Sequence, residues 1–341
     1  MTILSTRNHT SAYPHTPSAY PHPTGATNHP GNPMPEIRLR LSVKPPFRLD
    51  LTAWALRRRP HNIVDRFDGG IYRRIVTHGE SAVEVAVEQR GSVERPDLVA
   101  TVSGPGVSSA IGGNIEAMLN RMLGLDRDLE EFYDLAREDP TLGPMVVRLR
   151  GMKPVRFPVN FEAFVNAIAC QQISLDAGLH VVNRLVVNYG RRLRGGRAQT
   201  FAFPDSSALA RADIERLRQL GLSRGKARYL RALAALDSDP DAPGFSRFEA
   251  LDDKAALAAL CALKGVGRWT AEYVMLRGFG RVHIFPGDDV GGRNALARRM
   301  GLRRELDYEG VRHALARWSR FGGLIYFHLL LDSLLDKGVI A

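Results

Sequence analysis

Cysteine is nearly absent from this sequence, which has Cys170 and Cys261 and no others among its 341 residues. Two thiols cannot build a disulfide framework, and they fall short of the four thiolates that hold an iron–sulfur cluster. The sequence also has no apolar run of about 18 residues, the length that spans a bilayer. We therefore expect a protein that crosses no membrane and holds no iron–sulfur cluster. We also expect no catalytic metal and no organic cofactor.

Acidic residues are in the minority, with 36 Asp and Glu against 47 Lys and Arg. The formal net charge is +11 and the isoelectric point is about 10.0. This excess is suited to a polyanionic partner and predicts binding that weakens with salt. A merely arginine-rich composition gives the same number, so the charge alone does not identify a partner.

Residues 1–36 lack the apolar stretch of a secretory signal. They are rich in Pro, His, Ser, Thr and Asn, and they repeat SAYPH at 11–15 and 18–22. His15, His22 and His29 have no spacing that fits a compact metal site. The composition predicts a disordered tail or an over-extended start of the reading frame.

Residues 37–110 carry mostly strand patterns. Ile71–Thr77 and Ala82–Gln89 flank a hairpin signal at 78–81, and Leu98–Val102 is a further strand. A short helix is expected at Leu51–Arg59.

Residues 111–341 have helical periodicity instead. One apolar stripe comprises Ile115, Met118, Leu119, Met122 and Leu123. Asp213, Ser223 and Asp252 are placed to cap later helices. We expect an all-helical region in two lobes with a cleft between them.

The segment 263–289 reads LKGVGRWTAEYVMLRGFGRVHIFPGDD. Gly265 and Gly267 form a tight turn between two helices, and the second helix begins with unpaired N–H groups that attract an anion. About twenty residues later, Asp288 and Asp289 open another helix. A phosphate site with a carboxylate nearby is typical of enzymes that cleave nucleotides.

This segment resembles the helix-hairpin-helix and following aspartate of base-excision DNA glycosylases, whose turn reads L-P-G-V-G where this chain has Lys264 in place of proline. The blocks ACQQIS at 169–174, LGLSRGKARYLRALA at 220–234 and YFHLLL at 326–331 agree, and within the superfamily the DNA-3-methyladenine glycosylase II type is similar over residues 37–341. The resemblance implies an α+β fold: a small antiparallel domain at 37–110, followed by a helical, two-lobed glycosylase region at 111–341.

The resemblance assigns the catalytic carboxylate to Asp289, and we interpret Asp288 as a helix cap. Trp269 stands where strand-nicking relatives have a nucleophilic lysine, which implies release of the base without cleavage of the strand. Trp269 and Tyr273 are implied to line the pocket of the flipped base, and Val290 and Leu330 stand where the relative has further aromatic residues. Core packing is the alternative for the aromatic pair.

The DNA contacts implied by the resemblance lie in the hairpin and in one other loop. Gly265, Gly267 and Thr270 supply N–H groups to a phosphate, and Lys264 and Arg268 add charge. Gln171 and Gln172 fill the gap that the flipped base leaves, although the relative has leucine at the second place. The carbonyls of Cys261, Leu263 and Val266 match those that hold a structural monovalent cation in relatives.

The expected protein is thus a cytoplasmic, nucleoid-associated monomer that binds double-stranded DNA and excises alkylated bases. The aromatic pair predicts a preference for cationic bases such as 3-methyladenine. A DNA-binding hairpin protein without catalysis, or a glycosylase for another lesion, are the alternatives. His328 is expected to satisfy a hydrogen bond in the core.

Overall fold

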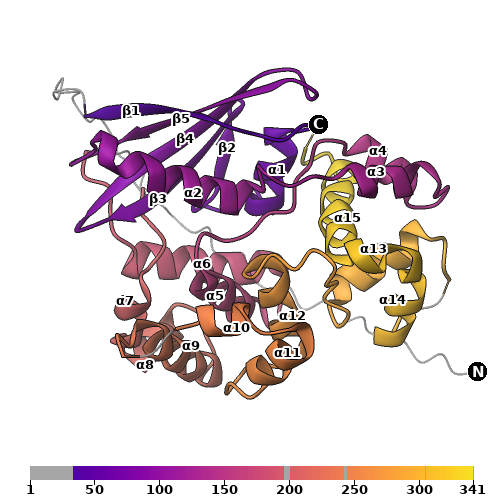
Figure 1. Ribbon diagram of the computed structural model, residues 1–341. Coiled ribbons are helices and arrows are strands. Elements are labelled where there is room, and N and C mark those ends of the chain that lie inside the picture. The colour runs from indigo at the N-terminus through magenta and orange to yellow at the C-terminus, as the bar shows by residue number, and fades with distance from the viewer. Residues whose placement is uncertain (1–33, 196–199, 242–243, 304, 341) are drawn as a thin grey trace, which may run out of the picture. The chain divides into compact units, whose positions relative to one another are not determined.

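The computed structural model describes residues 34–195, 200–241, 244–303 and 305–340 (Figure 1). The predicted tail therefore lies almost entirely outside the described residues. Its last predicted position is wrong, because Glu36 already pairs with Ser103 in the first strand.

An antiparallel sheet of five strands, in the order β1-β5-β4-β3-β2, forms the first part of the described chain. The strands are β1 (Glu36–Leu41), β2 (Arg66–Asp68), β3 (Ile71–His78), β4 (Ser81–Gly91) and β5 (Pro96–Ser103), and α1 (Leu49–Arg57) lies between β1 and β2. The predicted hairpin is present, with His78 opposite Ser81 across a two-residue turn. Alternation in β4 buries Val83, Val85 and Val87 on one face, and this face packs into the core.

Helices are nearly all of the regular secondary structure in the remaining described chain. They are α2 (Gly112–Leu123), α3 (Glu130–Arg137), α4 (Gly143–Arg148), α5 (Asn160–Cys170), α6 (Leu175–Tyr189), α7 (Ser206–Ala210), α8 (Ile214–Gln219), α9 (Arg224–Ser238), α10 (Ser246–Glu249), α11 (Asp253–Cys261), α12 (Arg268–Arg277), α13 (Val290–Arg299), α14 (Tyr308–Ala314) and α15 (Gly322–Asp336). Asp213, Ser223 and Asp252 cap α8, α9 and α11 as predicted. No helix in the described ranges is long and apolar enough to cross a bilayer.

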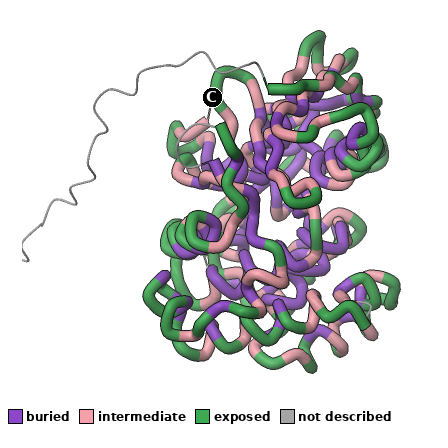
Figure 2. Tube along the Cα trace, turned by 90° about the vertical axis from the view of Figure 1, so that its left-hand side faces the viewer, coloured by how far each residue is buried: buried purple, intermediate pink, exposed green. Residues whose placement is uncertain are grey.

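Two large apolar cores organise the molecule, and buried chain runs through both (Figure 2). One core joins the sheet and α1 to α2–α4 and to the last helices, α13–α15. The other holds α5–α12, which include the predicted hairpin. The last helices therefore share a core with the sheet, an arrangement that hydrophobic periodicity does not reveal.

A buried ionic network joins the sheet to α5. Arg74 on β3 pairs with Asp65 at 2.8 Å and with Glu162 on α5, and all three side chains are 2% exposed. The Tyr72 hydroxyl donates to Asp65 at 2.7 Å. Removing one member of such a cluster leaves an uncompensated charge inside the protein, so the network fixes how the sheet meets the helices.

His328 on α15 is fully buried, and its Nδ1 lies 2.8 Å from the Leu324 carbonyl, which accepts the expected core hydrogen bond. Burial lowers the pKa of this imidazole from an ordinary 6.5 to about 4. As the pH falls, the unfolded chain therefore protonates His328 before the folded chain does. The contribution of the neutral His328 to the free energy of unfolding is lost as the pH falls from 6.5 towards 4.

We expect His328→Gln to lose about 2 kcal/mol less unfolding free energy than the wild type between pH 7 and pH 5. Urea unfolding of both proteins at both pH values measures these losses. The comparison of the two proteins removes the contribution of the other titrating groups, which is common to both. Parallel losses in the two proteins would contradict the assignment.

Candidate active site

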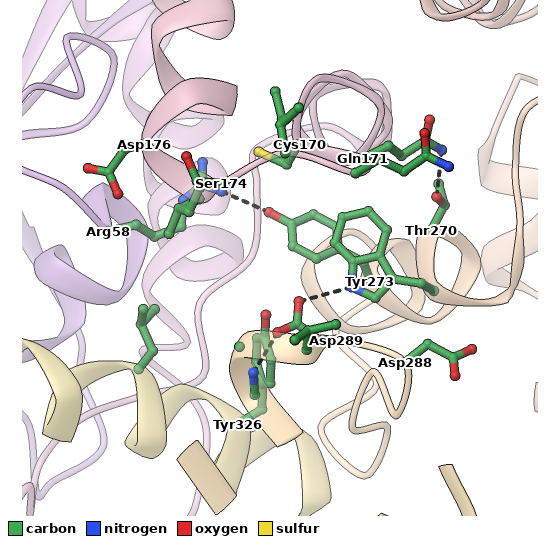
Figure 3. Close-up of a pocket in the computed structure, with 18 of the residues that line it drawn as sticks. Arg58, Cys170, Gln171, Ser174, Asp176, Thr270, Tyr273, Asp288, Asp289 and Tyr326 are labelled. Carbon is green, nitrogen blue, oxygen red and sulfur yellow. Dashed lines mark hydrogen bonds between the residues drawn. The ribbon is translucent and has the colours of Figure 1, made fainter. Parts of the chain in front are cut away.

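A cavity of about 1320 Å³ brings together side chains from distant parts of the chain (Figure 3). Its lining includes Arg58 at the end of α1, Gln171 and Gln172 between α5 and α6, Lys226 on α9, Trp269 and Tyr273 on α12, Asp289 at the start of α13, and Tyr326 and Leu330 on α15. Most of the predicted site residues therefore meet in one place. Lys264 and Arg268 lie outside the lining.

Asp289 is held on two sides at the N-terminus of α13. Its Oδ1 accepts the Gly292 N–H at 2.6 Å, which makes Asp289 the cap of this helix, and its Oδ2 accepts the Trp269 Nε1–H at 2.9 Å. Tyr326 also faces this carboxylate, and burial together with the Asp289 charge raises the pKa of the Tyr326 phenol. A half-buried carboxylate in fixed orientation is suited to stabilising a positive charge that develops next to it.

Asp288 is not the cap that the sequence suggested. It forms a two-pronged ion pair with Arg268, at 2.7 and 3.0 Å, and the Arg268 guanidinium lies 3.8 Å from the Tyr308 ring centroid. The capping rule allows either of two adjacent aspartates, and here the second one caps. Arg268, predicted as a phosphate contact, thus has an acidic partner in this structure.

Glu272 on α12 supports the same turn and was missed from the sequence. Its side chain is 4% exposed and accepts the Gly287 N–H at 3.0 Å and the Tyr308 hydroxyl at 2.6 Å. Gly287 is two residues before Asp289. The role of Glu272 could not be predicted from the sequence, because its hydrogen-bond partners are 15 and 36 positions away.

The predicted aromatic pair forms one wall of the cavity. The ring centroids of Trp269 and Tyr273 are 5.5 Å apart, and Tyr273 is 5% exposed. Val290, at 59% exposed, lies at the rim, whereas Leu330 is half-buried in the lining. The deep wall is therefore aromatic, and the positions that lack aromatic residues are further out.

The hairpin turn has the expected geometry. Gly265 has φ +89°, and a Cβ there would lie 2.3 Å from the Tyr229 ring, so this position requires glycine. A Cβ on Gly267 would meet no atom within 4 Å, which leaves the backbone open to a ligand. Lys264 is exposed. Thr270 is buried, and its backbone N–H lies in the first turn of α12.

Gln171 and Gln172 differ in their contacts. The Gln171 side-chain amide donates to the Gly265 carbonyl and to Thr270 Oγ1, both at 2.9 Å, so this residue braces the hairpin. Gln172 is exposed and has a left-handed φ of +56°, and the next residue, Ile173, is 42% exposed. In this structure Gln171 is thus tied to the hairpin, and Gln172, with Ile173, is exposed on the loop.

Two buried arginines at the Tyr273 end of the cavity were not predicted. Arg58 and Arg277 are 3% and 1% exposed. Arg58 Nη1 donates to the Tyr273 hydroxyl at 3.0 Å, and the Arg277 guanidinium lies 5.8 Å from the Tyr273 ring centroid. Arg58 and Tyr273 are 215 positions apart, so no local pattern connects them.

The fold and this site define a class of protein, and comparison with known families agrees. A model of the HhH-GPD superfamily of base excision DNA repair proteins matches residues 165–320, and a model of the AlkA N-terminal domain matches residues 38–162. The chain therefore contains an AlkA-type N-terminal domain followed by an HhH-GPD domain of the base excision DNA repair superfamily. This confirms the family predicted from the hairpin and the α+β fold.

Named relatives point to one branch of this superfamily. The probable bifunctional transcriptional activator/DNA repair enzyme AlkA of Mycobacterium tuberculosis is 34% identical over 217 residues, which are 62% of this chain and 41% of the relative. The DNA-3-methyladenine glycosylase 2 of Escherichia coli is 31% identical over 169 residues, 47% of this chain and 57% of the relative. The matched parts thus span about half of these relatives' length.

Among solved structures, the 3-methyladenine DNA glycosylase of Archaeoglobus fulgidus superposes with a TM-score of 0.74 at 26% identity. The match covers 88% of this chain and 98% of that one. The similarity therefore extends over the sheet and both helical groups.

Proposed function

We propose that this protein is a monofunctional DNA glycosylase that flips out an alkylated base, of the 3-methyladenine type, and releases it by hydrolysis. The proposal depends above all on Asp289, whose carboxylate is fixed between the Gly292 N–H and the Trp269 indole in the wall of the cavity. The partner is double-stranded DNA that contains damaged bases, bound by a monomer, and the product is an abasic site.

The chemistry follows from the charges in the cavity. As the N-glycosidic bond breaks, positive charge develops on the sugar, and a carboxylate beside it lowers the energy of that transition state. The same carboxylate orients a water for attack on the sugar carbon. The departing base lies against Trp269 and Tyr273, where it is shielded from the solvent.

The hairpin holds the strand near the lesion. The N–H groups of Gly265, Gly267 and Thr270, with the exposed Lys264, suit one phosphate, and the space beside the Gly267 backbone is open. Arg268 is paired with Asp288 through Nε and Nη2, which leaves its Nη1 as a donor for a phosphate. Gln172 and Ile173 project from the loop that would enter the gap in the duplex.

We propose no organic cofactor, and a single monovalent cation on the carbonyls of Cys261, Leu263 and Val266. Carbonyl oxygens are fitting ligands for such a hard ion. The Leu263 carbonyl already accepts the Val266 N–H at 3.0 Å, so one lone pair there remains for a cation.

A hairpin protein that only binds DNA is the rival function. It needs neither a carboxylate in the cavity nor an aromatic wall beside it. Incubation with methylated genomic DNA, followed by mass spectrometry of the released bases, decides between them. Free 3-methyladenine and 7-methylguanine are the expected products, and a supernatant without free bases would exclude the proposed activity.

The product strand should remain intact until hot alkali is added, because Trp269 cannot act as a nucleophile. Lys226 also lines the cavity, but its Nζ donates to the carbonyls of Ala169, at 3.2 Å, and Gln171, at 2.5 Å. Borohydride trapping on damaged duplex should give no covalent adduct. An adduct that disappears in Lys226→Met would show that this lysine attacks the sugar.

A further inference from the structure

Among the described residues, the Tyr273 hydroxyl has one hydrogen-bond partner, and this partner can only donate. Arg58 Nη1 donates to it at 3.0 Å, and a guanidinium has no acceptor atom. The phenolic proton must therefore point elsewhere. Within the described ranges, no acceptor lies within hydrogen-bond distance of it, and the residue lines the cavity.

Arg58 combines a strained backbone conformation with a buried charge. Arg58 has a left-handed φ of +61° at the end of α1, a strained conformation that few non-glycine residues adopt. Its guanidinium donates to Asn166 Oδ1 at 2.5 Å, its buried Nε has no partner among the described residues, and it forms no ion pair with a described carboxylate. The strained turn brings a cation without an ion-paired carboxylate among the described residues to the end of the pocket.

Arg277 strengthens this positive region. It is buried, its Nη2 donates to the Ala55 carbonyl at 2.9 Å, and its guanidinium lies 5.8 Å from the Tyr273 ring centroid. Tyr273 therefore already has a cation beside its ring. Two buried cations oppose the cationic-base preference that the sequence suggested for this wall, and they favour an electron-rich atom instead.

We propose that Arg58 sets the Tyr273 hydroxyl as a hydrogen-bond donor towards the flipped base, so that the pocket selects bases with an acceptor atom at the edge that reaches it. Neutral purines with a carbonyl oxygen or an unsubstituted ring nitrogen there, such as hypoxanthine, belong to this class, and so does 7-methylguanine through its carbonyl. The inference rests on the proposed glycosylase function and adds a specificity residue from the N-terminal domain.

The test removes either the donor or the acceptor. Single-turnover excision is measured from duplexes with hypoxanthine and with three analogues. The analogues 7-deazahypoxanthine and 3-deazahypoxanthine lack the N7 and N3 acceptors, and purine lacks O6 and has an unprotonated N1 in place of the N1–H. On hypoxanthine, we expect Tyr273→Phe to be about tenfold slower than the wild type. On the analogue that lacks the atom accepting from the Tyr273 hydroxyl, the rates of the wild type and Tyr273→Phe should become nearly equal.

Arginine variants separate hydroxyl orientation from charge. Arg58→Met should reproduce the analogue dependence of Tyr273→Phe, and Arg58→Lys, which keeps a donor, should restore part of the wild-type pattern. Arg277→Met is the matched control, because it removes a buried cation from the same ring without touching the hydroxyl. This variant should change the excision rates of all four substrates by a similar factor. Melting temperatures identify any variant that does not fold.

The outcomes distinguish the inference from the function beneath it. If the wild type releases no base from any duplex, the glycosylase proposal fails. Calorimetric binding of free hypoxanthine and the free analogues to the wild type and Tyr273→Phe then tests the hydroxyl directly, with the same ratio expected. If Tyr273→Phe changes all four substrates or ligands equally, the hydroxyl reads no acceptor and the inference is overturned.

Discussion

Asp289→Asn should abolish base release while the protein still folds and binds DNA. A carboxylate about 4 Å from a developing positive charge contributes about 4 kcal/mol at a surface-like dielectric. Its loss therefore slows excision about 10³-fold or more. Asparagine retains an oxygen for the Gly292 N–H, so α13 keeps its cap, although the Trp269 indole loses its charged acceptor.

The neighbouring aspartate gives the control. Asp288→Asn breaks the ion pair with Arg268 but leaves the Asp289 contacts in place, and excision should fall by only a small factor. Single-turnover kinetics on a duplex with 3-methyladenine or hypoxanthine, together with equilibrium DNA binding, measures both variants. Comparable losses in the two would contradict the assignment of Asp289.

Gly265→Ala should destabilise the hairpin, and Gly267→Ala should not. At Gly265 the positive φ and the ring of Tyr229, 2.3 Å from a new Cβ, each add strain, and together they cost about 2–5 kcal/mol. At Gly267 the φ of −94° suits any residue and the Cβ meets no neighbour, so folding is retained. The methyl group would instead occupy space that a phosphate needs.

Two measurements distinguish these glycines. Urea unfolding should show the loss for Gly265→Ala alone, and DNA affinity should fall about tenfold for Gly267→Ala at low salt. If Gly267→Ala binds as tightly as the wild type, the phosphate does not approach the backbone at that point.

Local features of the site were predictable from the sequence, and long-range ones were not. The turn at Gly265, the cap at the start of α13 and the shared face of Trp269 and Tyr273 each depend on a few adjacent residues, whose rules are general. The choice between Asp288 and Asp289 as cap depended on Arg268, twenty positions away. Local chemistry could not make that choice.

A different reason explains why the sequence did not predict the roles of Arg58, Arg277 and Glu272. Each is a charged residue that the amphipathic pattern assigns to the solvent, and each is buried where distant parts of the chain supply its hydrogen-bond partners. The same holds for Arg74 and Glu162, whose pairing joins two segments 88 positions apart. Burial of charge is decided by contacts that form only when the whole chain is folded.

The cavity lies where the two apolar cores meet, since Arg58 enters from the helix that packs on the sheet and Trp269 from the hairpin group. Any fluctuation that separates these cores dismantles the binding site. A ligand that binds only the closed arrangement stabilises it by thermodynamic linkage, about 2.7 kcal/mol at a hundredfold excess over Kd. Amide hydrogen exchange in α1 and α5 should therefore slow when the pocket is occupied. The protein should resist unfolding and proteolysis most strongly while its pocket is occupied.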